Sequence, residues 1–126
     1  LVDVDNFKRI NDTFGHPVGD NAIRTIANAC QSVINDADII GRLGGDEFGI
    51  MHKKTSPTSH QVLAQQLIES VSQLLVNDTL TNFRLSISIG MSHFKNDDTS
   101  IEALYNRVDE ALYQCKKRGK NGYAEK

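Results

Sequence analysis

The chain has 126 residues, a length that suits one domain with a single hydrophobic core. Hydrophobic residues make up 39% of it and charged residues 24%, the ordinary balance of a soluble globular protein. The formal net charge is −2, so the basic surface typical of a nucleic-acid-binding protein is absent and we expect no nucleic-acid partner. An anionic ligand would need local cations, helix ends or a metal ion.

The first half of the chain predicts short elements joined by glycine turns. Residues 1–4 read as a strand, and residues 6–14 as a helix that ends at Gly15. Pro17 suits the first turn of a second helix over residues 17–35. The apolar stripe of that helix consists of Val18, Ala22, Ile26, Cys30 and Val33. Residues 38–52 are expected to form a hairpin whose central positions are the adjacent glycines Gly44 and Gly45.

The second half predicts a helix, a strand, a helix and a strand. Residues 56–76 read as a helix with one apolar face: Leu63, Leu67, Val71 and Leu74. In residues 84–94, serines alternate with inward-facing Leu85, Ile87, Ile89 and Met91. A capping box of Thr99 and Glu102 begins the last helix. Its apolar stripe consists of Ile101, Leu104, Tyr105, Val108, Leu112 and Cys115.

A short strand near residues 121–125 is expected to close the fold. The resulting order, βααββαβαβ, predicts an α+β fold with a largely antiparallel central sheet flanked by helices.

Cysteine usage and hydropathy bear on location. Cys30 and Cys115 fall on apolar stripes, so we interpret them as buried free thiols in a reducing compartment, with a disulfide as the alternative. No apolar run approaches the roughly 18 residues that span a bilayer. The sequence begins at Leu1 with a strand already under way, which indicates a fragment. We expect a cytoplasmic location, alone or as the cytoplasmic part of a larger, membrane-anchored protein.

The stretch GRLGGDEFGI, residues 41–50, places Asp46 and Glu47 at a glycine turn. It is either a hairpin turn whose acids only keep the loop solvated, or a turn that presents those acids to a ligand. In LVDVD, alternation sends the valines to one face and Asp3 and Asp5 to the other, exposed face. Asp5 is interpreted as a helix cap. If the strand lies beside the hairpin, Asp3 and Asp46 converge on a hard cation, which prefers oxygen ligands.

Three separated blocks occur in this order: DVDNFKRINDTFGHPVGD at 3–20, GGDEF at 44–48 and ALYQCKKRGKNG at 111–122. Together they closely resemble the GGDEF-domain diguanylate cyclases, over the whole chain, and favour the ligand-presenting explanation of the hairpin. The resemblance implies a single domain over residues 1–126, truncated at its N-terminus relative to the family, with a palm-like sheet. It also implies a reaction in which two GTP condense into cyclic di-GMP and two pyrophosphates leave.

The resemblance also implies a metal site. Asp3 and Asp46 would be side-chain ligands of Mg²⁺, with Mn²⁺ as the alternative ion, and Val4 would contribute its backbone carbonyl. Glu47 is expected to be essential for catalysis, either as a ligand of the metal or as a group that assists deprotonation of the attacking hydroxyl.

Phosphate contacts follow from the same resemblance. The backbone amides of Phe7 and Lys8 begin a helix, which is a natural seat for phosphate. Lys116 and Lys120 match the family's contacts to the terminal phosphate. The family more often has arginine at the position of Lys120, and lysine lacks the bidentate fork of arginine.

Asn11 and Asp20 resemble the family's guanine-reading residues. A carboxylate can accept hydrogen bonds from both the N1–H and the exocyclic amine of guanine, which adenine cannot satisfy. Asp20 therefore indicates strict use of GTP. His16 is interpreted as a structural turn residue, and the remaining histidines as surface positions: His52, His60 and His93.

The leading hypothesis is an active, Mg²⁺-dependent diguanylate cyclase domain that works as a homodimer downstream of a sensor domain. The rival hypothesis is a non-catalytic GTP-binding or regulatory module. Many relatives also carry an inhibitory product site, R-x-x-D, five residues before the glycine pair. Here that window reads NDAD, so Asp38 is kept but Asn35 replaces the arginine and the site is degenerate.

Overall fold

The fold of the computed structural model follows the expected order of elements. The structure describes residues 1–56, 58–76 and 82–126. Within them the elements are β1 Val2–Val4, α1 Phe7–Phe14, α2 His16–Val33, β2 Ile39–Gly44, β3 Glu47–Met51, α3 His60–Ser72, β4 Ile87–Met91, α4 Ile101–Lys117 and β5 Gly122–Glu125. The predicted order βααββαβαβ is therefore confirmed.

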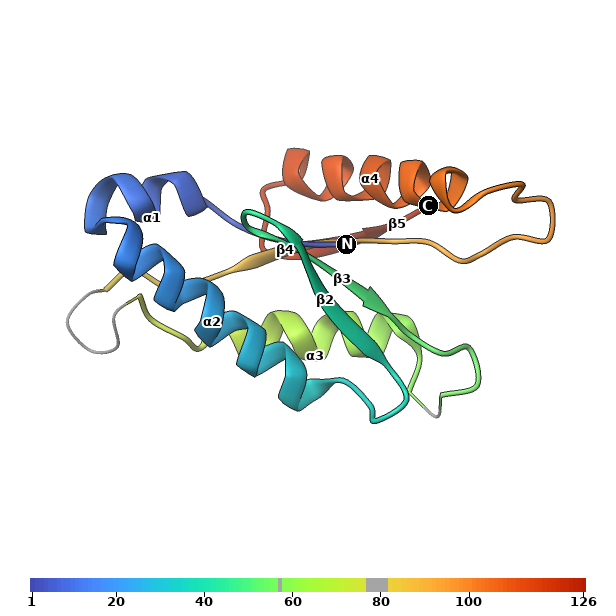
Figure 1. Ribbon diagram of the computed structural model, residues 1–126, viewed down its shortest axis with the longest axis horizontal. Helices are drawn as coiled ribbons and strands as arrows, with labels where there is room; N and C mark the ends of the chain where they lie inside the picture. Colours follow the sequence, from blue (N-terminus) through green and yellow to red (C-terminus); the bar gives the residue numbers. More distant parts are fainter. Residues whose placement is uncertain (57, 77–81) are drawn as a thin grey trace.

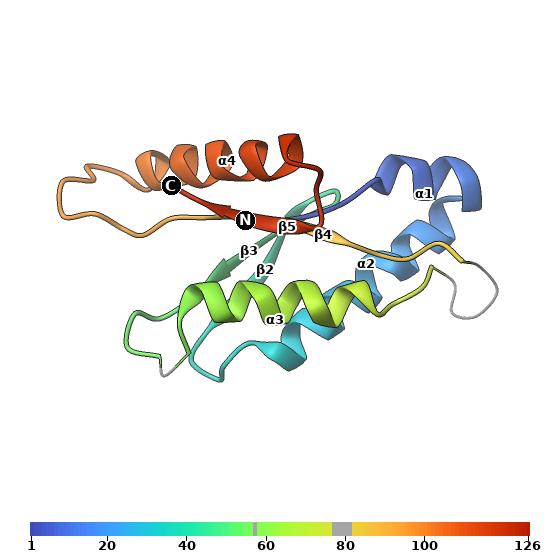
Figure 2. The same cartoon turned by 180° about the vertical axis from the view of Figure 1, so that it is seen from behind.

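The strands form one sheet in the order β2-β3-β1-β4-β5. β1 is central and pairs antiparallel with both β3 and β4, and β2 and β3 form the hairpin. Only the pair of β4 and β5 is parallel in the described part of the sheet, because α4 crosses over between these strands. Helices α2 and α3 cover one face and α4 covers the other (Figures 1 and 2). The prediction of a largely antiparallel sheet flanked by helices is confirmed.

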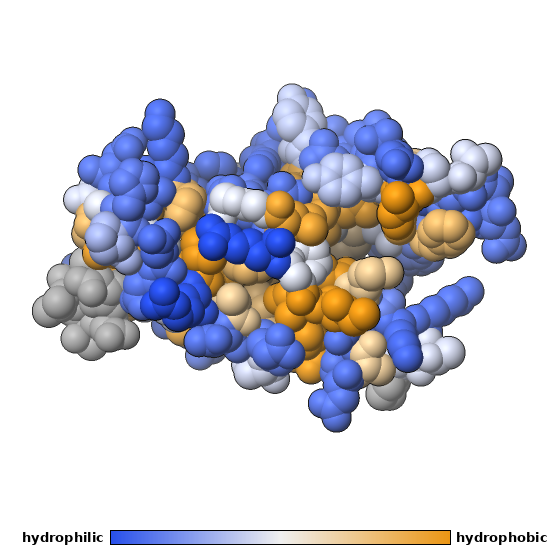
Figure 3. Space-filling view, in the orientation of Figure 1, coloured by the Kyte–Doolittle hydropathy of each residue, from blue (hydrophilic) through white to orange (hydrophobic). Residues whose placement is uncertain are grey.

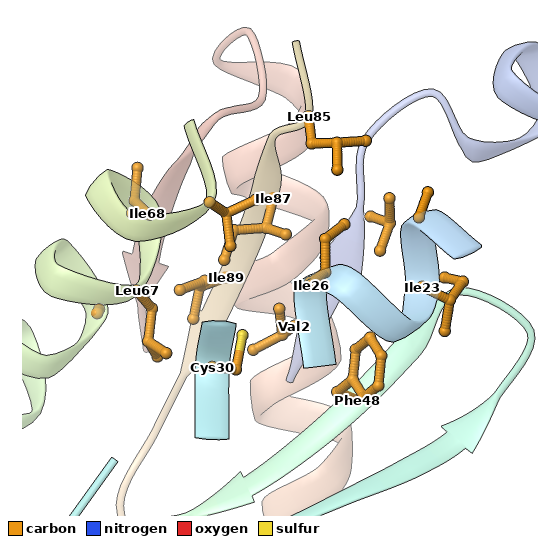
Figure 4. Packing of buried hydrophobic residues seen from close by; sticks show 14 of the residues in the cluster. Val2, Ile23, Ile26, Cys30, Phe48, Leu67, Ile68, Leu85, Ile87 and Ile89 are labelled. Atoms are coloured by element: carbon orange, nitrogen blue, oxygen red, sulfur yellow. The ribbon is translucent and has the colours of Figure 1, made fainter. Parts of the chain in front are cut away.

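The main core lies between the sheet and helices α2 and α3. Strand residues such as Val2, Phe48 and Ile87 meet Ile26 of α2 and Leu67 of α3 there (Figure 4). Every one of these side chains is buried, so their burial supplies the dominant favourable term in folding.

Both cysteines are buried and free, as the helical stripes predict, and the disulfide alternative is wrong. Burial raises the pKa of the Cys30 thiol to about 11, which keeps it protonated and unreactive. Cys115 packs with Ala111 and Ala124 in a second, smaller cluster under α4.

Helix α4 lies directly on β4 because the strand has a glycine at the crossing point. A Cβ atom at Gly90 would collide with the backbone of α4 at Val108 and Leu112. Glycine therefore permits a close helix–strand approach that no other residue would allow.

Two helix starts expected from the sequence are wrong. The helix expected over 56–76 begins at His60, because Ser59 caps it by accepting a hydrogen bond from the Val62 amide at 3.2 Å; Pro57 lies outside the described residues. The last helix begins after Ser100 rather than Thr99. Its expected stripe also fails at its first turns, where Ile101 and Tyr105 are exposed.

The strand expected over 84–94 is shorter, and both of its faces are buried. Ser88 was expected on the solvent side but is completely buried under α4. Alternation predicted which residues face the main core, but it could not show that a helix also covers the serine face.

Apolar side chains are exposed on the outer strand pair, over β2 and β3 (Figure 3). Ile39, Leu43 and Met51 are the large exposed residues there. Within the described residues, every helix is too short or too polar to cross a membrane.

Candidate functional site

The turn between β2 and β3 is centred one residue later in the chain than the sequence predicts. Gly44 pairs with Glu47, so Gly45 and Asp46 occupy the two central positions, rather than the two glycines. Gly45 has a φ of 47°, in the left-handed region that glycine adopts without strain. The register between the strands shifts between Arg42 and Gly44, which moves the turn. Asp46 therefore lies at the tip of the hairpin.

Strand β1 brings Asp3 against this hairpin. Asp3 pairs with Glu47, and residues directly opposite in an antiparallel pair share one face of the sheet. The Val4 amide donates a hydrogen bond to the backbone oxygen of Asp46 at 3.0 Å, which ties the turn to β1. Three carboxylates from two segments thus gather at one end of β1. Asp3 is 9% exposed rather than solvent-facing as expected.

Lys116, in the last turn of α4, forms an ion pair with Asp3. Burial raises the pKa of Asp3; the bond from Lys116 lowers it, and the nearby Asp46 and Glu47 raise it, leaving it above its usual value. Burial lowers the pKa of Lys116, but the carboxylates outweigh this effect and raise it overall. The ammonium group is therefore the positive charge that this cluster of acids attracts.

Asp5 does not cap a helix, which corrects the sequence-based interpretation. The cap position of α1 is Asn6, and Asp5 is buried. Its carboxylate accepts hydrogen bonds from the hydroxyls of Ser88 at 2.6 Å and Ser86 at 2.7 Å, and from the Asn121 amide at 3.0 Å. Asp5 thus joins β1, β4 and the loop after α4, and it fixes the loop that carries Lys120.

The N-terminus of α1 and Lys120 lie together. Asn6 adopts a left-handed conformation, and its side chain makes no capping hydrogen bond to the helix. Instead it accepts a hydrogen bond from the Lys120 ammonium at 2.8 Å. The amides of Phe7 and Lys8 are in the first turn, where backbone donors lack intrahelical partners. The structure therefore brings these two residues and Lys120 to one place.

Asn11 and Asp20 lie on consecutive helices, α1 and α2. The side chain of Asn11 is packed so tightly against Gly19 that a Cβ atom there would collide with its Oδ1. That oxygen is buried and has no hydrogen-bond partner among the described residues. Asp20 is exposed and lines a pocket of about 590 Å³ between α2 and the β2–β3 hairpin, together with Arg24 and Phe48. Asn11 does not line that pocket.

Asp38 and Asn35 form a hydrogen-bonded network rather than an open surface site. The side chain of Asp38 is completely buried and accepts from the Asn35 amide at 3.0 Å and the Lys53 amide at 3.2 Å. His52 Nδ1 lies 2.9 Å from the same carboxylate, and its Nε2 lies 2.8 Å from the Thr58 carbonyl oxygen. His52 is therefore not a plain surface position.

Sequence reasoning missed the contact of Tyr105 with the acids. Its hydroxyl donates a hydrogen bond to Glu47 Oε1 at 3.3 Å, and the negative charge of Glu47 raises the pKa of Tyr105. The helical stripe assigned Tyr105 to the core, and its 45% exposure contradicts that assignment. Only the tertiary placement of α4 over the sheet reveals this pair.

The donor set fits a hard divalent cation. The groups at the end of β1 are carboxylates and backbone carbonyls, which are the ligands that Mg²⁺ and Mn²⁺ prefer. After burial, which is the largest cause, the negative charges of Asp46 and Glu47 also raise the pKa of Asp3, as expected for carboxylates gathered in one place.

Comparison with known proteins identifies the family to which this fold belongs. A family model described as "Diguanylate cyclase, GGDEF domain" matches residues 1–122. The chain is similar to diguanylate cyclase A of Treponema denticola, with 35% identity over 121 residues, which cover 96% of this chain and 33% of that protein. It is 33% identical over 121 residues to the cyclic di-GMP phosphodiesterase NbdA of Pseudomonas aeruginosa, covering 96% of this chain and 15% of that protein.

A solved structure, the active GGEEF domain of a diguanylate cyclase from Vibrio cholerae, has a TM-score of 0.88 with this fold. Its sequence identity is 35%, and the match covers 98% of this chain and 78% of that one. This chain therefore belongs to the GGDEF family of diguanylate cyclase domains. It spans about a third of the length of the Treponema relative.

Proposed function

We propose that the domain condenses two GTP molecules into cyclic di-GMP with release of two pyrophosphates. In each half of the reaction, a 3′-hydroxyl oxygen bonds to the α-phosphorus of the other nucleotide. The bond from that phosphorus to the pyrophosphate oxygen breaks, and the hydroxyl proton is lost. The observation that carries the proposal is the gathering of Asp3, Asp46 and Glu47 at the end of β1 in a GGDEF-family fold.

Asp3, Asp46 and the Val4 carbonyl would hold Mg²⁺ or Mn²⁺ in this proposal. Such an ion neutralises phosphate charge and lowers the pKa of the attacking hydroxyl. Glu47 lies opposite Asp3 and either binds the ion or accepts the hydroxyl proton at its carboxylate. Tyr105 donates to one oxygen of Glu47 and orients it.

The cations near the acids would hold the phosphates. The amides of Phe7 and Lys8 and the ammonium of Lys120 lie at the same helix start, where the helix dipole also favours negative charge. Lys116 would exchange its bond to Asp3 for a phosphate oxygen when the nucleotide and ion bind. This exchange would keep every charge in the site paired.

The guanine would be read by Asn11 and Asp20. The unpartnered, buried Oδ1 of Asn11 supports this assignment, because a buried acceptor without a donor is costly and a base N–H would satisfy it. Gly19 supports it as well, because only glycine leaves room for the Asn11 side chain.

A homodimer would be needed for turnover. The proposed site binds one nucleotide per chain, whereas the product joins two nucleotides symmetrically. Two copies with their sites face to face satisfy this requirement. A sensor domain elsewhere in the whole protein would control this encounter.

The test is to incubate the protein with GTP and Mg²⁺, and separately with Mn²⁺, and to detect cyclic di-GMP by chromatography. The rate per mole of protein should rise with protein concentration as dimers form. If GTP binds in calorimetry but no product forms at high protein concentration, the domain is instead a non-catalytic GTP-binding or regulatory module.

A further inference from the structure

His60, His93 and Glu125 gather at the end of the molecule where α3 begins and β4 and β5 end (Figures 1 and 2). We propose that these three side chains bind a transition-metal ion of the Zn²⁺ type, at a site separate from the acids around Asp3. The proposal does not depend on the proposed cyclase activity.

The ligand atoms are already close enough for one ion. One nitrogen from each histidine and one oxygen of Glu125 all lie within 4.8 Å of one another. His60 Nε2 is 2.9 Å and His93 Nδ1 is 3.7 Å from Glu125 Oε1. Tetrahedral zinc places its nitrogen and oxygen ligands about 3.3 Å apart, since each lies about 2.0–2.1 Å from the metal. Small side-chain rotations would therefore complete the site.

The chemistry of the ligands selects the kind of metal. Two imidazoles and one carboxylate suit Zn²⁺, Ni²⁺ or Cu²⁺, whereas Mg²⁺ and Ca²⁺ prefer oxygen ligands alone. Three protein ligands leave a fourth position for water. The site thus differs in metal preference from the carboxylates at the end of β1, and this difference makes the two sites separable by experiment.

Two of the three ligands lie in regular structure, and His93 is in the loop that directly follows β4. His60 is the first residue of α3, directly after the Ser59 cap. Glu125 ends β5 in parallel register with Met91, and the hydroxyl of Ser92 donates to the Lys126 carbonyl at 2.8 Å, so the chain leading to His93 is fixed beside β5.

A fourth side chain orients the carboxylate. Gln61 Nε2 donates a hydrogen bond to Glu125 Oε2 at 3.0 Å, which leaves Oε1 facing the histidines. Partners of this kind, which hold a metal ligand in place, commonly contribute to metal affinity. The two imidazole rings meet edge to face with centroids 4.6 Å apart.

The first test is to titrate Zn²⁺ into the protein in buffer with excess Mg²⁺, which occupies the oxygen-only site. Calorimetry should give one saturable equivalent. In ¹H–¹⁵N spectra of the histidine rings, the signals of His60 and His93 should shift while those of His16 and His52 stay unchanged. This readout requires no variant. Absence of saturable binding, or shifts spread over all four histidines, would overturn the proposal.

The second test uses variants. Gln61→Ala should weaken Zn²⁺ binding by about 10–100-fold, and His93→Ala and Glu125→Gln, which each remove a ligand, by at least as much. Zn²⁺ should also raise the melting temperature of the wild type, because a ligand that binds only the folded state stabilises it, but not that of His93→Ala. His16→Ala, which removes an exposed histidine from another part of the chain, is the matched control. Undiminished binding in His93→Ala would contradict the assignment.

Discussion

Lys116 of α4 is ion-paired with Asp3 of β1 at the point where the acidic hairpin meets the central strand. Asp3 is buried, and a buried carboxylate is costly without a positive partner. Near this pair, Gly90 lets the middle of α4 lie close to β4, because a Cβ atom there would collide with the helix backbone at Val108 and Leu112. The lysine and a divalent cation would compete for the same oxygen.

Replacing Lys116 should therefore have opposite effects on the binding of Mg²⁺ and of GTP. We expect Lys116→Ala to strengthen Mg²⁺ binding to the nucleotide-free protein, because a competing charge is removed. It should weaken GTP binding by about 10–100-fold, because a hydrogen bond to a charged group is worth about 1.5–3 kcal/mol. Calorimetry with each ligand measures both.

Lys117→Ala is the matched control for this change. It removes the same charge from the same helix turn, but the Lys117 ammonium lies 5.5 Å from the ring centroid of Tyr113, away from the acids. If the Lys116 and Lys117 variants behave alike, the pairing of Lys116 with Asp3 does not govern ligand binding.

Asp46→Asn should abolish turnover and leave the fold intact. Asp46 is at the tip of a turn and is tied to β1 by a hydrogen bond from the Val4 amide to its backbone oxygen, which the substitution keeps. Loss of a metal ligand should cost about 4 kcal/mol in transition-state stabilisation, a fall of about a thousandfold in cyclic di-GMP production. The melting temperature should remain unchanged. Asp97→Asn, in an exposed loop, is the control; activity retained in Asp46→Asn would show that the metal site lies elsewhere.

The periodicity of apolar residues predicted the structure well where an element buries only one face. It predicted the order of elements, the antiparallel sheet and the two buried thiols. The convergence of Asp3 and Asp46 depended on the first strand lying beside the hairpin, and β1 does pair with β3. Sequence reasoning failed where a residue is buried by an element distant in the chain. Asp5 was interpreted as a local cap, but it bonds Ser86, Ser88 and Asn121.

The same limit explains the missed polar networks. Residue types alone could not show that His52 reaches the buried Asp38, or that Tyr105 reaches Glu47, because both contacts depend on how loops and helices dock. The turn was displaced by one residue for a similar reason, since the register shift after Arg42 depends on pairing between strands.

Asp20→Ser should relax the preference for GTP over ATP. The variant removes the carboxylate that would accept from both guanine donors, and one bidentate contact to a base contributes about 1–3 kcal/mol of discrimination. Competition of the two nucleotides in calorimetry measures the change. Asp109→Ser, which removes an exposed acid from α4, should leave the preference intact. Discrimination as strong as before in Asp20→Ser would show that another residue reads the base.

The pair of His52 and Asp38 should make stability depend on pH. Both ring nitrogens of His52 face oxygen acceptors, so the charged imidazolium satisfies both. Burial lowers the pKa of His52, but the bonds to Asp38 and Thr58 raise it overall; burial raises the pKa of Asp38, but His52 and two backbone amides lower it overall.

The pair should contribute most to the free energy of unfolding between about pH 4 and pH 6.5, which are the ordinary pKa values of aspartate and histidine. Its contribution should fall as the pH rises through the raised pKa of His52, and as the pH drops through the lowered pKa of Asp38. Urea unfolding near pH 5.5 should show His52→Gln to be less stable than the wild type by about 1.5–3 kcal/mol. At pH 9 the difference in the free energy of unfolding between the two proteins should be smaller. A difference that does not vary with pH would show that His52 is neutral in the folded state.

The position of Asp38 also predicts how the domain responds to its proposed product. In the R-x-x-D pattern the aspartate and arginine would grip cyclic di-GMP, but here the Asp38 carboxylate is buried and engaged by Asn35, His52 and Lys53. Asn35 offers no charge, and the neighbouring Asp36 adds a negative one near an anionic ligand. We therefore expect no tight product binding at this surface.

Calorimetric titration of cyclic di-GMP into the wild type, Asn35→Arg and Ser32→Arg tests this expectation. Only Asn35→Arg should gain affinity, because an arginine there can present its charged fork to phosphate or guanine. Ser32→Arg adds the same charge three residues earlier on the exposed surface of α2 and controls for charge alone.

Asp38→Ala is unsuitable as a first test, since it would leave the donors around a buried carboxylate unpaired and destabilise the fold. If the wild type binds cyclic di-GMP with sub-micromolar affinity and a folded Asn35→Ala variant binds it equally well, the product site lies elsewhere. If that variant loses the binding, the prediction that the site at residues 35–38 is degenerate is wrong.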